Sequence, residues 1–274
     1  MANFIQQRIW DHIVLNSSES ETEWLLKKGE ANSLDLMTAF VAAPRFLSKR
    51  IIQLPDSEPT GFKVNGWSLV RLARVWLLTQ LDASDRTEYV KNIETLFDTA
   101  EMNELVALYS ALPLLAYPEQ WLFRATDAVR SNMGFVFDAI ALHNPYPERF
   151  FSEAAWNQLV LKTIFNDKPI HLIEGIDTRT NVELAITLSD FAHERWAAGR
   201  SVPPQVWRLV SPFLNDVLLA DLKYLLESGI ESNQKAAALA AFASGYPPAD
   251  TLLSAYPELK KSVSSGALSW ADLE

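Results

Sequence analysis

The sequence predicts an all-α protein, and three observations support this prediction. Apolar residues recur with the helical period of about 3.6 residues along most of the chain. Alternation of β-branched and polar residues, which indicates strands, is rare. Tyr-Pro pairs occur four times, and proline suits the first helical turn because its missing N–H would be unpaired there anyway. The tyrosine before each proline is expected to leave helical dihedrals. The four pairs are Tyr117-Pro118, Tyr146-Pro147, Tyr246-Pro247 and Tyr256-Pro257.

The elements can be placed in order along the chain. Residues 1–15 are amphipathic and lack the unbroken apolar stretch of a signal peptide. Residues 66–81 form a broad apolar sector in which Arg71 and Arg74 share one side. A short strand, or equally coil, is expected only at 62–64. The other predicted helices cover about 19–30, 33–42, 86–98, 101–112, 118–131, 133–142, 152–166, 180–198, 203–213, 214–228, 232–243 and 248–263.

Long helices joined by short turns predict stacked antiparallel helix pairs. An α-solenoid of the HEAT-like kind, a globular helical bundle and an irregular helical array all stay open, because no strict repeat period continues along the chain. No low-complexity linker divides the sequence. We therefore expect a single domain over residues 1–274, with a sub-boundary near 50–66, where prolines and a glycine gather.

Composition excludes several classes of function. The chain has no cysteine, which rules out disulfides, thiolate nucleophiles, iron–sulfur clusters and thiolate zinc sites. A net charge of −10 argues against binding nucleic acid or anionic membranes by bulk charge. The longest nearly apolar run, Leu105 to Ala116, is shorter than the roughly 20 residues that span a bilayer. We expect a soluble chain without a transmembrane segment, in the cytoplasm or peripheral at the inner membrane.

Searches for catalytic motifs are negative. The glycine-rich nucleotide loops and the G-x-S-x-G elbow are absent. His193-Glu194 begins like a zinc protease motif, but Ala197 occupies the position of the second histidine. We therefore predict no catalytic residue, no metal ligand and no cofactor.

Polar residues concentrate between Trp121 and Arg200. Arg124, Asp127 and Arg130 follow one another at i,i+3 spacing on a predicted helix. Two guanidinium groups held by one carboxylate are suited to grip an anionic ligand. A salt-bridge ladder, either solvated or between helices, explains the same spacing without any ligand.

Further candidates for ligand binding lie in the same region. Asp190 precedes His193 by three residues, which on a helix places its carboxylate beside the imidazole for general-base chemistry or for a purely structural pair. His143 and Asn144 stand at the end of one helix, where they suit either a ligand or a cap and turn. Amide and charged groups beside large aromatics suit a binding pocket or ordinary packing. The remaining candidates of this polar region are Asn132, Asn157 and Arg195.

The central stretch resembles the EboA family. The resemblance covers roughly residues 100–210 and is carried by LYSALPLL (108–115), WLFRATDAVRSNM (121–133), FDAIAL (137–142), NPYP (144–147), WNQLVLK (156–162) and AHERWAAGR (192–200). EboA-like proteins are bacterial metabolite traffic proteins whose genes lie beside those of a prenyltransferase and other enzymes. The resemblance implies a part in making or moving a small secondary metabolite. It implies no reaction and no residue roles.

Three functional hypotheses follow. The first is a non-catalytic component that binds a metabolite or acts as a scaffold for the proteins of an Ebo-type cluster, the prenyltransferase among them. The second is a helical enzyme acting on a small anionic or prenylated metabolite, with Arg124, Arg130, His143, Asp190 and His193 in one cleft. The third is a structural domain for protein–protein interaction, without a small ligand.

Overall fold

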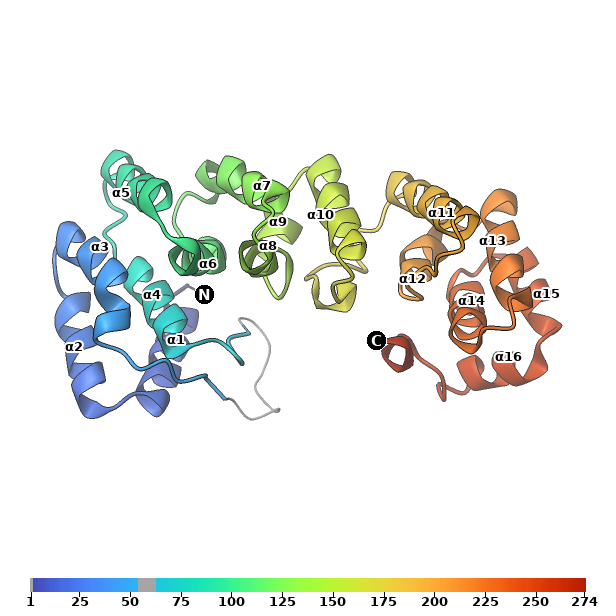
Figure 1. The fold of residues 1–274 in the computed structure, drawn as a ribbon, viewed down its shortest axis with the longest axis horizontal. Helices are drawn as coiled ribbons and strands as arrows, with labels where there is room; N and C mark the ends of the chain where they lie inside the picture. Colours follow the sequence, from blue (N-terminus) through green and yellow to red (C-terminus); the bar gives the residue numbers. More distant parts are fainter. Residues whose placement is uncertain (1, 54–62) are drawn as a thin grey trace. The chain divides into compact units, whose positions relative to one another are not determined.

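The computed structural model is built from α-helices that turns, loops and 3-10 helices connect (Figure 1). The structure describes residues 2–53 and 63–274. Within these ranges there are α-helices and no β-strand, and the only bridge is an isolated antiparallel one between Ile51 and Ser68. The predicted all-α fold class is confirmed. Phe62, in the stretch considered for a strand, lies outside the described residues, and Lys63 and Val64 are coil.

The chain divides into two compact units, Met1–Ala155 and Trp156–Glu274. The helix α10 (Glu153–Phe165) begins just before the division and continues beyond it. The single domain over residues 1–274 stays a prediction. The sub-boundary expected near 50–66 falls largely on residues 54–62, which lie outside the described residues.

The first unit is organised around α4. This helix packs against α1, α2, α3 and α6, and α6 in turn packs against α8, which also contacts α7. The helices are α1 (Ala2–Asn16), α2 (Glu19–Gly29), α3 (Ser33–Ala42), α4 (Leu69–Thr79), α5 (Arg86–Thr99), α6 (Met102–Ala111), α7 (Leu122–Arg130), α8 (Gly134–Ala141) and α9 (Tyr146–Phe150).

The sequence of α4 explains its central place. Ser68 caps the helix, since its Oγ accepts a hydrogen bond from the Arg71 N–H at 3.2 Å. Nine of its eleven side chains are buried, so apolar residues are needed all around the helix. Arg74 is buried with them, at 2% exposure, and donates to Glu104 at 2.9 Å and to the Phe40 carbonyl at 2.9 Å. A buried charge is tolerated only with such partners.

The second unit is organised around α14. This helix packs against α12, α13, α15 and α16. Its buried side chains are mostly alanines, at 236, 237, 238, 240 and 241, which let helices approach closely on several sides. The helices that follow α10 in this unit are α11 (Val182–Ala197), α12 (Val206–Val210), α13 (Asp216–Glu227), α14 (Glu231–Ala243), α15 (Pro247–Ser254) and α16 (Pro257–Ser264).

Helices that follow one another pack as pairs within each unit, as predicted. Examples are α7 with α8, α11 with α12, α13 with α14 and α15 with α16. Helices of neighbouring pairs also pack on one another, in the rows α4, α6, α8 and α12, α14, α16 (Figure 1). The core of each unit therefore lies along its row.

Proline decides several helix boundaries. Tyr117 adopts a left-handed φ of 54° before Pro118, and Tyr246 and Tyr256 also lie outside the helices that follow them. Tyr146 differs from the prediction because it is the first residue of α9, with Pro147 in its first turn. The predicted helix 248–263 is two helices, since Pro257 starts α16 after a break at Ala255 and Tyr256.

Candidate functional site

A groove of about 830 Å³ in the second unit lies where the ends of α11 and α13 and the start of α14 meet the loop 198–204. Its volume is in the range of about 300–1,000 Å³ typical of small-molecule sites. A smaller pocket of about 300 Å³ lies beside it, since both are lined by Asp167, Pro203 and Pro204. These two hollows form the candidate site.

Aromatic rings form one wall of the groove. Trp196 on α11 and Tyr224 on α13 both line it, with ring centroids 4.4 Å apart. Trp196 also stacks on Trp207 of α12, at 5.7 Å and nearly parallel. Trp207 is fully buried, so it holds the wall from behind, while Tyr224 is 51% exposed. Such a wall offers apolar contact to a flat or prenylated ligand.

His193 lies against this wall and is anchored by a buried carboxylate. Its ring centroid is 5.6 Å from that of Trp196. Its Nε2 lies 2.6 Å from Oδ1 of Asp221 on α13, and Ser189 donates its hydroxyl to Oδ2 of the same carboxylate at 2.6 Å. Asp221 is 4% exposed, whereas the His193 side chain is 52% exposed. A solvent-facing imidazole oriented by a buried carboxylate has the geometry of a general base or of a polar ligand anchor.

The rim of the groove is polar. Arg195 donates from Nε to the Ser201 carbonyl, which ties α11 to the loop, and its guanidinium lies 5.5 Å from the Phe191 ring. Arg200 and Glu227 also line the groove, so charges of both signs face it. A ligand with both acceptor and donor groups matches this rim.

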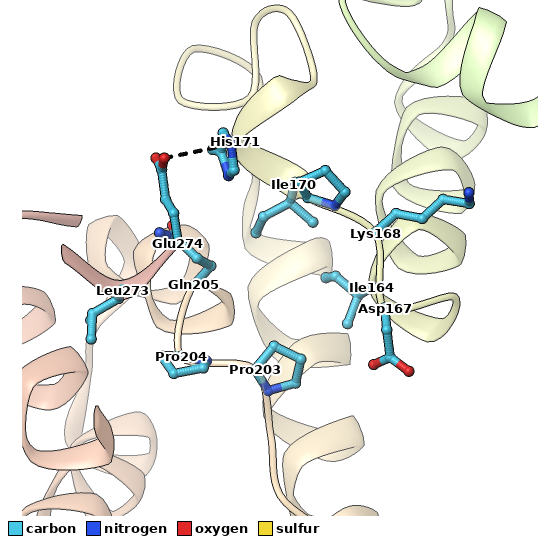
Figure 2. Close-up of a pocket in the computed structure, with 11 residues that line it drawn as sticks. Ile164, Asp167, Lys168, Ile170, His171, Pro203, Pro204, Gln205, Leu273 and Glu274 are labelled. Carbon is cyan, nitrogen blue, oxygen red and sulfur yellow. Dashed lines mark ion pairs between the residues drawn. The ribbon is translucent and has the colours of Figure 1, made fainter. Parts of the chain in front are cut away.

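Figure 2 shows the smaller pocket, with Ile164 and Ile170 on one side and Gln205, Leu273 and Glu274 on the other. His171 and Glu274 form an ion pair at 3.5 Å. Gln205 is 7% exposed and donates to the Trp270 carbonyl at 2.7 Å, but its buried Oε1 has no partner among residues 2–53 and 63–274. A buried acceptor without a donor is costly, so a ligand donor or a water would be favourable here.

The predicted Arg124–Asp127–Arg130 cluster does not form as expected in the first unit. Arg124 turns to α5, where it donates to Glu94 and Asp98 and stacks over Phe97. Burial would lower the pKa of Arg124, but the bonds to these carboxylates raise it. Asp127 pairs with Arg130 at 3.3 Å on the exposed surface. This arrangement matches the salt-bridge alternative.

The other candidates of the first unit have structural surroundings. Asn144 is buried and donates to the Tyr109 and Ala139 carbonyls at 3.0 and 2.8 Å, while its Oδ1 accepts from the Tyr146 N–H. His143 is half-buried and adopts a left-handed φ of 54°. Asn132 is exposed. Ligand binding by these residues stays a prediction.

In the second unit, the expected Asp190–His193 pair is replaced by Asp221–His193. Asp190 is exposed and lies on α11 itself, whereas Asp221 comes from the neighbouring α13. Asn157 exchanges two hydrogen bonds with Asn181, the cap of α11, at 3.2 and 2.8 Å. Of the ten candidates, His193 and Arg195 therefore lie at or beside the groove. Arg124, Arg130 and His143 belong to the first unit, so neither unit contains the predicted enzyme set.

Sequence reasoning missed Asp221, Ser189, Tyr224 and Gln205. One signal was present, because Asp221 interrupts the apolar face of the predicted helix 214–228, next to Leu218, Leu222 and Leu225. A carboxylate at such a position needs a buried partner. Among the residues that the structure describes, no group of three or more acidic or histidine side chains is arranged to hold a metal ion.

Comparison with known proteins identifies one family. A family model described as "Metabolite traffic protein EboA" matches residues 2–211. The match includes α11 with His193, Arg195 and Trp196, and it ends before α13. No match is found among curated proteins or among solved structures.

Proposed function

The chain belongs to the EboA family, and on this premise we propose that it is a non-catalytic component that binds a small metabolite. It would serve a bacterial system that makes or exports a secondary metabolite. The family description, metabolite traffic, supports a role of this kind.

The observation that carries the proposal is the groove beside α11. Trp196 and Tyr224 offer an apolar wall, and Arg195, Arg200 and Asn233 offer polar groups at its rim. Few polar anchors on an aromatic surface are typical of small-molecule sites. A metabolite with a flat or prenylated body would lie on the wall, with its polar substituents toward the rim.

Protein partners belong to the same proposal. The resemblance to EboA implies a prenyltransferase and other proteins of the cluster, for which this chain would act as a scaffold. A cytoplasmic position, or one peripheral at the inner membrane, fits that role. In the part of the chain that the structure describes, no helix is long and apolar enough to cross a membrane.

Native mass spectrometry of the protein purified from its own host tests metabolite binding. We expect an additional mass on the folded chain, released on denaturation. Trp196→Ala should lose this mass, because it removes the centre of the aromatic wall. Trp24→Ala is the matched control, since Trp24 stacks on Phe46 at 4.7 Å in the first unit and does not line the groove. A wild-type chain without any added mass, or a Trp196→Ala chain that retains it, contradicts the proposal.

The Asp221–His193 pair favours a second candidate, an enzyme whose base is His193. The bound metabolite would then change mass on incubation with the protein, and His193→Ala would abolish the change. Glu194→Ala, at the next and exposed position of α11, is the control. An unchanged metabolite in the wild-type reaction would exclude this candidate.

A further inference from the structure

A third hollow, of about 380 Å³, lies in the first unit between the start of α4, the start of α6 and residues 44–51. Its apolar lining includes Ile51, Val70 and Val106. Its cationic lining consists of Lys49, Arg71 and Arg74. All of these residues lie inside the range that matches the EboA family.

The Arg71 guanidinium is held in one orientation by neutral groups. It stacks on the Trp67 ring at 3.8 Å. Its Nε and Nη2 donate to Ser110 Oγ at 3.0 and 2.7 Å, while the Ser110 hydroxyl donates to the Val106 carbonyl. The remaining donors of the Arg71 guanidinium are the protons of Nη1 and the second proton of Nη2. These donors have no hydrogen-bond acceptor among residues 2–53 and 63–274.

Arg71 differs in this respect from Arg74, one turn further along α4. Arg74 is bonded to Glu104 and to the Phe40 carbonyl and lies 3.5 Å from Glu101. Arg71 forms no ion pair with a carboxylate in the described ranges, and the charge of Asp138 acts on its guanidinium electrostatically. Burial lowers the pKa of Arg71 to about 9, with Asp138 opposing the shift. The charge of Arg71 is therefore poorly compensated where it lies.

The surroundings of the pocket determine which ligand would fit. Lys49 is exposed at the rim and forms no ion pair in the described part of the chain. Glu101 also lines the pocket, but its carboxylate is engaged with Arg74 and with the N–H of Glu104, which it caps. Two cations without carboxylate partners, in a chain of net charge −10, favour one anionic group. A guanidinium edge matches the two oxygens of a carboxylate or phosphate.

We propose that Arg71 and Lys49 bind the carboxylate or phosphate group of a small metabolite, whose apolar part lies against Ile51, Val70 and Val106. This site belongs to the first unit and does not depend on the groove beside α11. It adds an anionic group to the chemistry that the protein recognises.

Isothermal titration calorimetry with phenyl phosphate, benzoate and neutral benzyl alcohol tests this proposal. We expect at least one of the two anions to bind the wild-type chain and benzyl alcohol not to bind. The anion that binds more tightly identifies the anionic group of the metabolite as a phosphate or a carboxylate. Arg71→Met keeps a long apolar side chain but removes the guanidinium group, and should weaken binding of the anion at least about tenfold. Arg86→Met is the matched control, because Arg86 also lies over an aromatic ring, Tyr117 at 5.4 Å, but is exposed outside the pocket.

A second variant tests the proposal if circular dichroism shows that Arg71→Met does not fold. Lys49→Ala changes an exposed side chain and should weaken binding by about two- to fivefold, since exposed ion pairs contribute little. The absence of binding by both anions overturns the proposal. If Arg71→Met folds and binds the anion as tightly as the wild type does, the proposal is also overturned. If Arg71→Met does not fold, the same affinity in Lys49→Ala and the wild type overturns it.

Discussion

Neighbouring helices, and not the nearest carboxylates along the chain, supply the acidic partners of His193 and Arg124. His193 lies three residues after Asp190, yet its imidazole bonds to Asp221 of α13. Arg124 likewise bonds to Glu94 of α5, and Asp127 pairs with Arg130 instead. A buried carboxylate offers a stronger interaction than an exposed one, because water competes less for its oxygens.

Replacing Asp221 tests the importance of this buried carboxylate. Asp221→Asn removes the negative charge that accepts bonds from Ser189 and His193, so we expect the free energy of unfolding to fall by about 1–3 kcal/mol. Asp190→Asn, at the exposed position, should change it by less than about 0.5 kcal/mol. Urea denaturation at neutral pH measures both. Equal effects of the two substitutions would contradict the assignment of Asp221 as the partner.

Glu21 links the start of α2 to the segment that follows η1 (Ala43–Arg45). Its carboxylate accepts hydrogen bonds from the Ser18 N–H at 2.7 Å and from the Ser48 N–H at 2.5 Å. Burial alone would raise the pKa of Glu21, but these bonds more than offset it and lower the pKa to about 2. The folded pKa is below the unfolded one, so stability from this group is present above about pH 4.5 and is lost as the pH falls toward 2.

The Glu21→Gln substitution should therefore have a pH-dependent effect. At pH 7 we expect it to lower the free energy of unfolding by about 1.5–3 kcal/mol, the usual contribution of hydrogen bonds to a charged group. The difference from the wild type should shrink between pH 4.5 and 2. Glu23→Gln, an exposed position on the same helix, is the control for denaturation at each pH. A difference that stays constant over this window would refute the role of the Glu21 charge.

At the scale of elements, capping and close packing set where helices begin and touch. Asn181 caps α11 and also bonds to Asn157 of α10, so one side chain both starts a helix and joins two. Gly29, the last residue of α2, lies against Trp76 of α4. Trp76 in turn contacts Trp10 of α1, at 4.7 Å between ring centroids. Three helices therefore meet around one indole ring.

The Gly29→Ala substitution tests this meeting point. An added Cβ would come within 2.4 Å of Cη2 of Trp76, which is 6% exposed. Alanine gains about 1 kcal/mol in helix propensity over glycine, but overpacking of a core costs about 1–3 kcal/mol. We expect a net loss of stability in thermal unfolding. Gly134→Ala is the matched control, because nothing lies near its Cβ, and it should be neutral or stabilising. A Gly29→Ala chain more stable than the wild type would contradict the close contact.

At the scale of the whole molecule, charge determines which large partners are unsuitable. The chain carries 34 acidic and 24 basic residues. An excess of ten negative charges repels polyanions over a distance of about 8–10 Å at physiological salt. The Arg71 pocket accommodates one small anionic group and does not alter this balance.

We therefore expect no charge-driven binding to DNA or to vesicles of anionic phospholipid at about 0.1 M salt. Co-sedimentation with anionic vesicles measures membrane binding, with neutral phosphatidylcholine vesicles as the control. An electrophoretic mobility shift measures DNA binding. Salt-sensitive binding to either polyanion would be inconsistent with this expectation. Capture by neutral and anionic vesicles alike would indicate an apolar contact and would leave the charge argument intact.

The sequence by itself determined the helical fold class, the family and most helix boundaries. These depend on local physics, since the period of apolar residues, the caps and the prolines act within a few residues of one another. The wrong boundaries include the uninterrupted helix 248–263, which Pro257 divides, and the start of α9, which includes Tyr146.

Only the tertiary structure decided the partners of the charged side chains and the places of the hollows. Arg71 and Arg74 are alike in sequence, on one side of one helix, yet two carboxylates of the α6 region meet only Arg74. Trp196 and Tyr224 form a wall because α11 and α13 bring them together from positions 28 residues apart. Long-range contacts of this kind depend on the packing of helices, which no local pattern encodes.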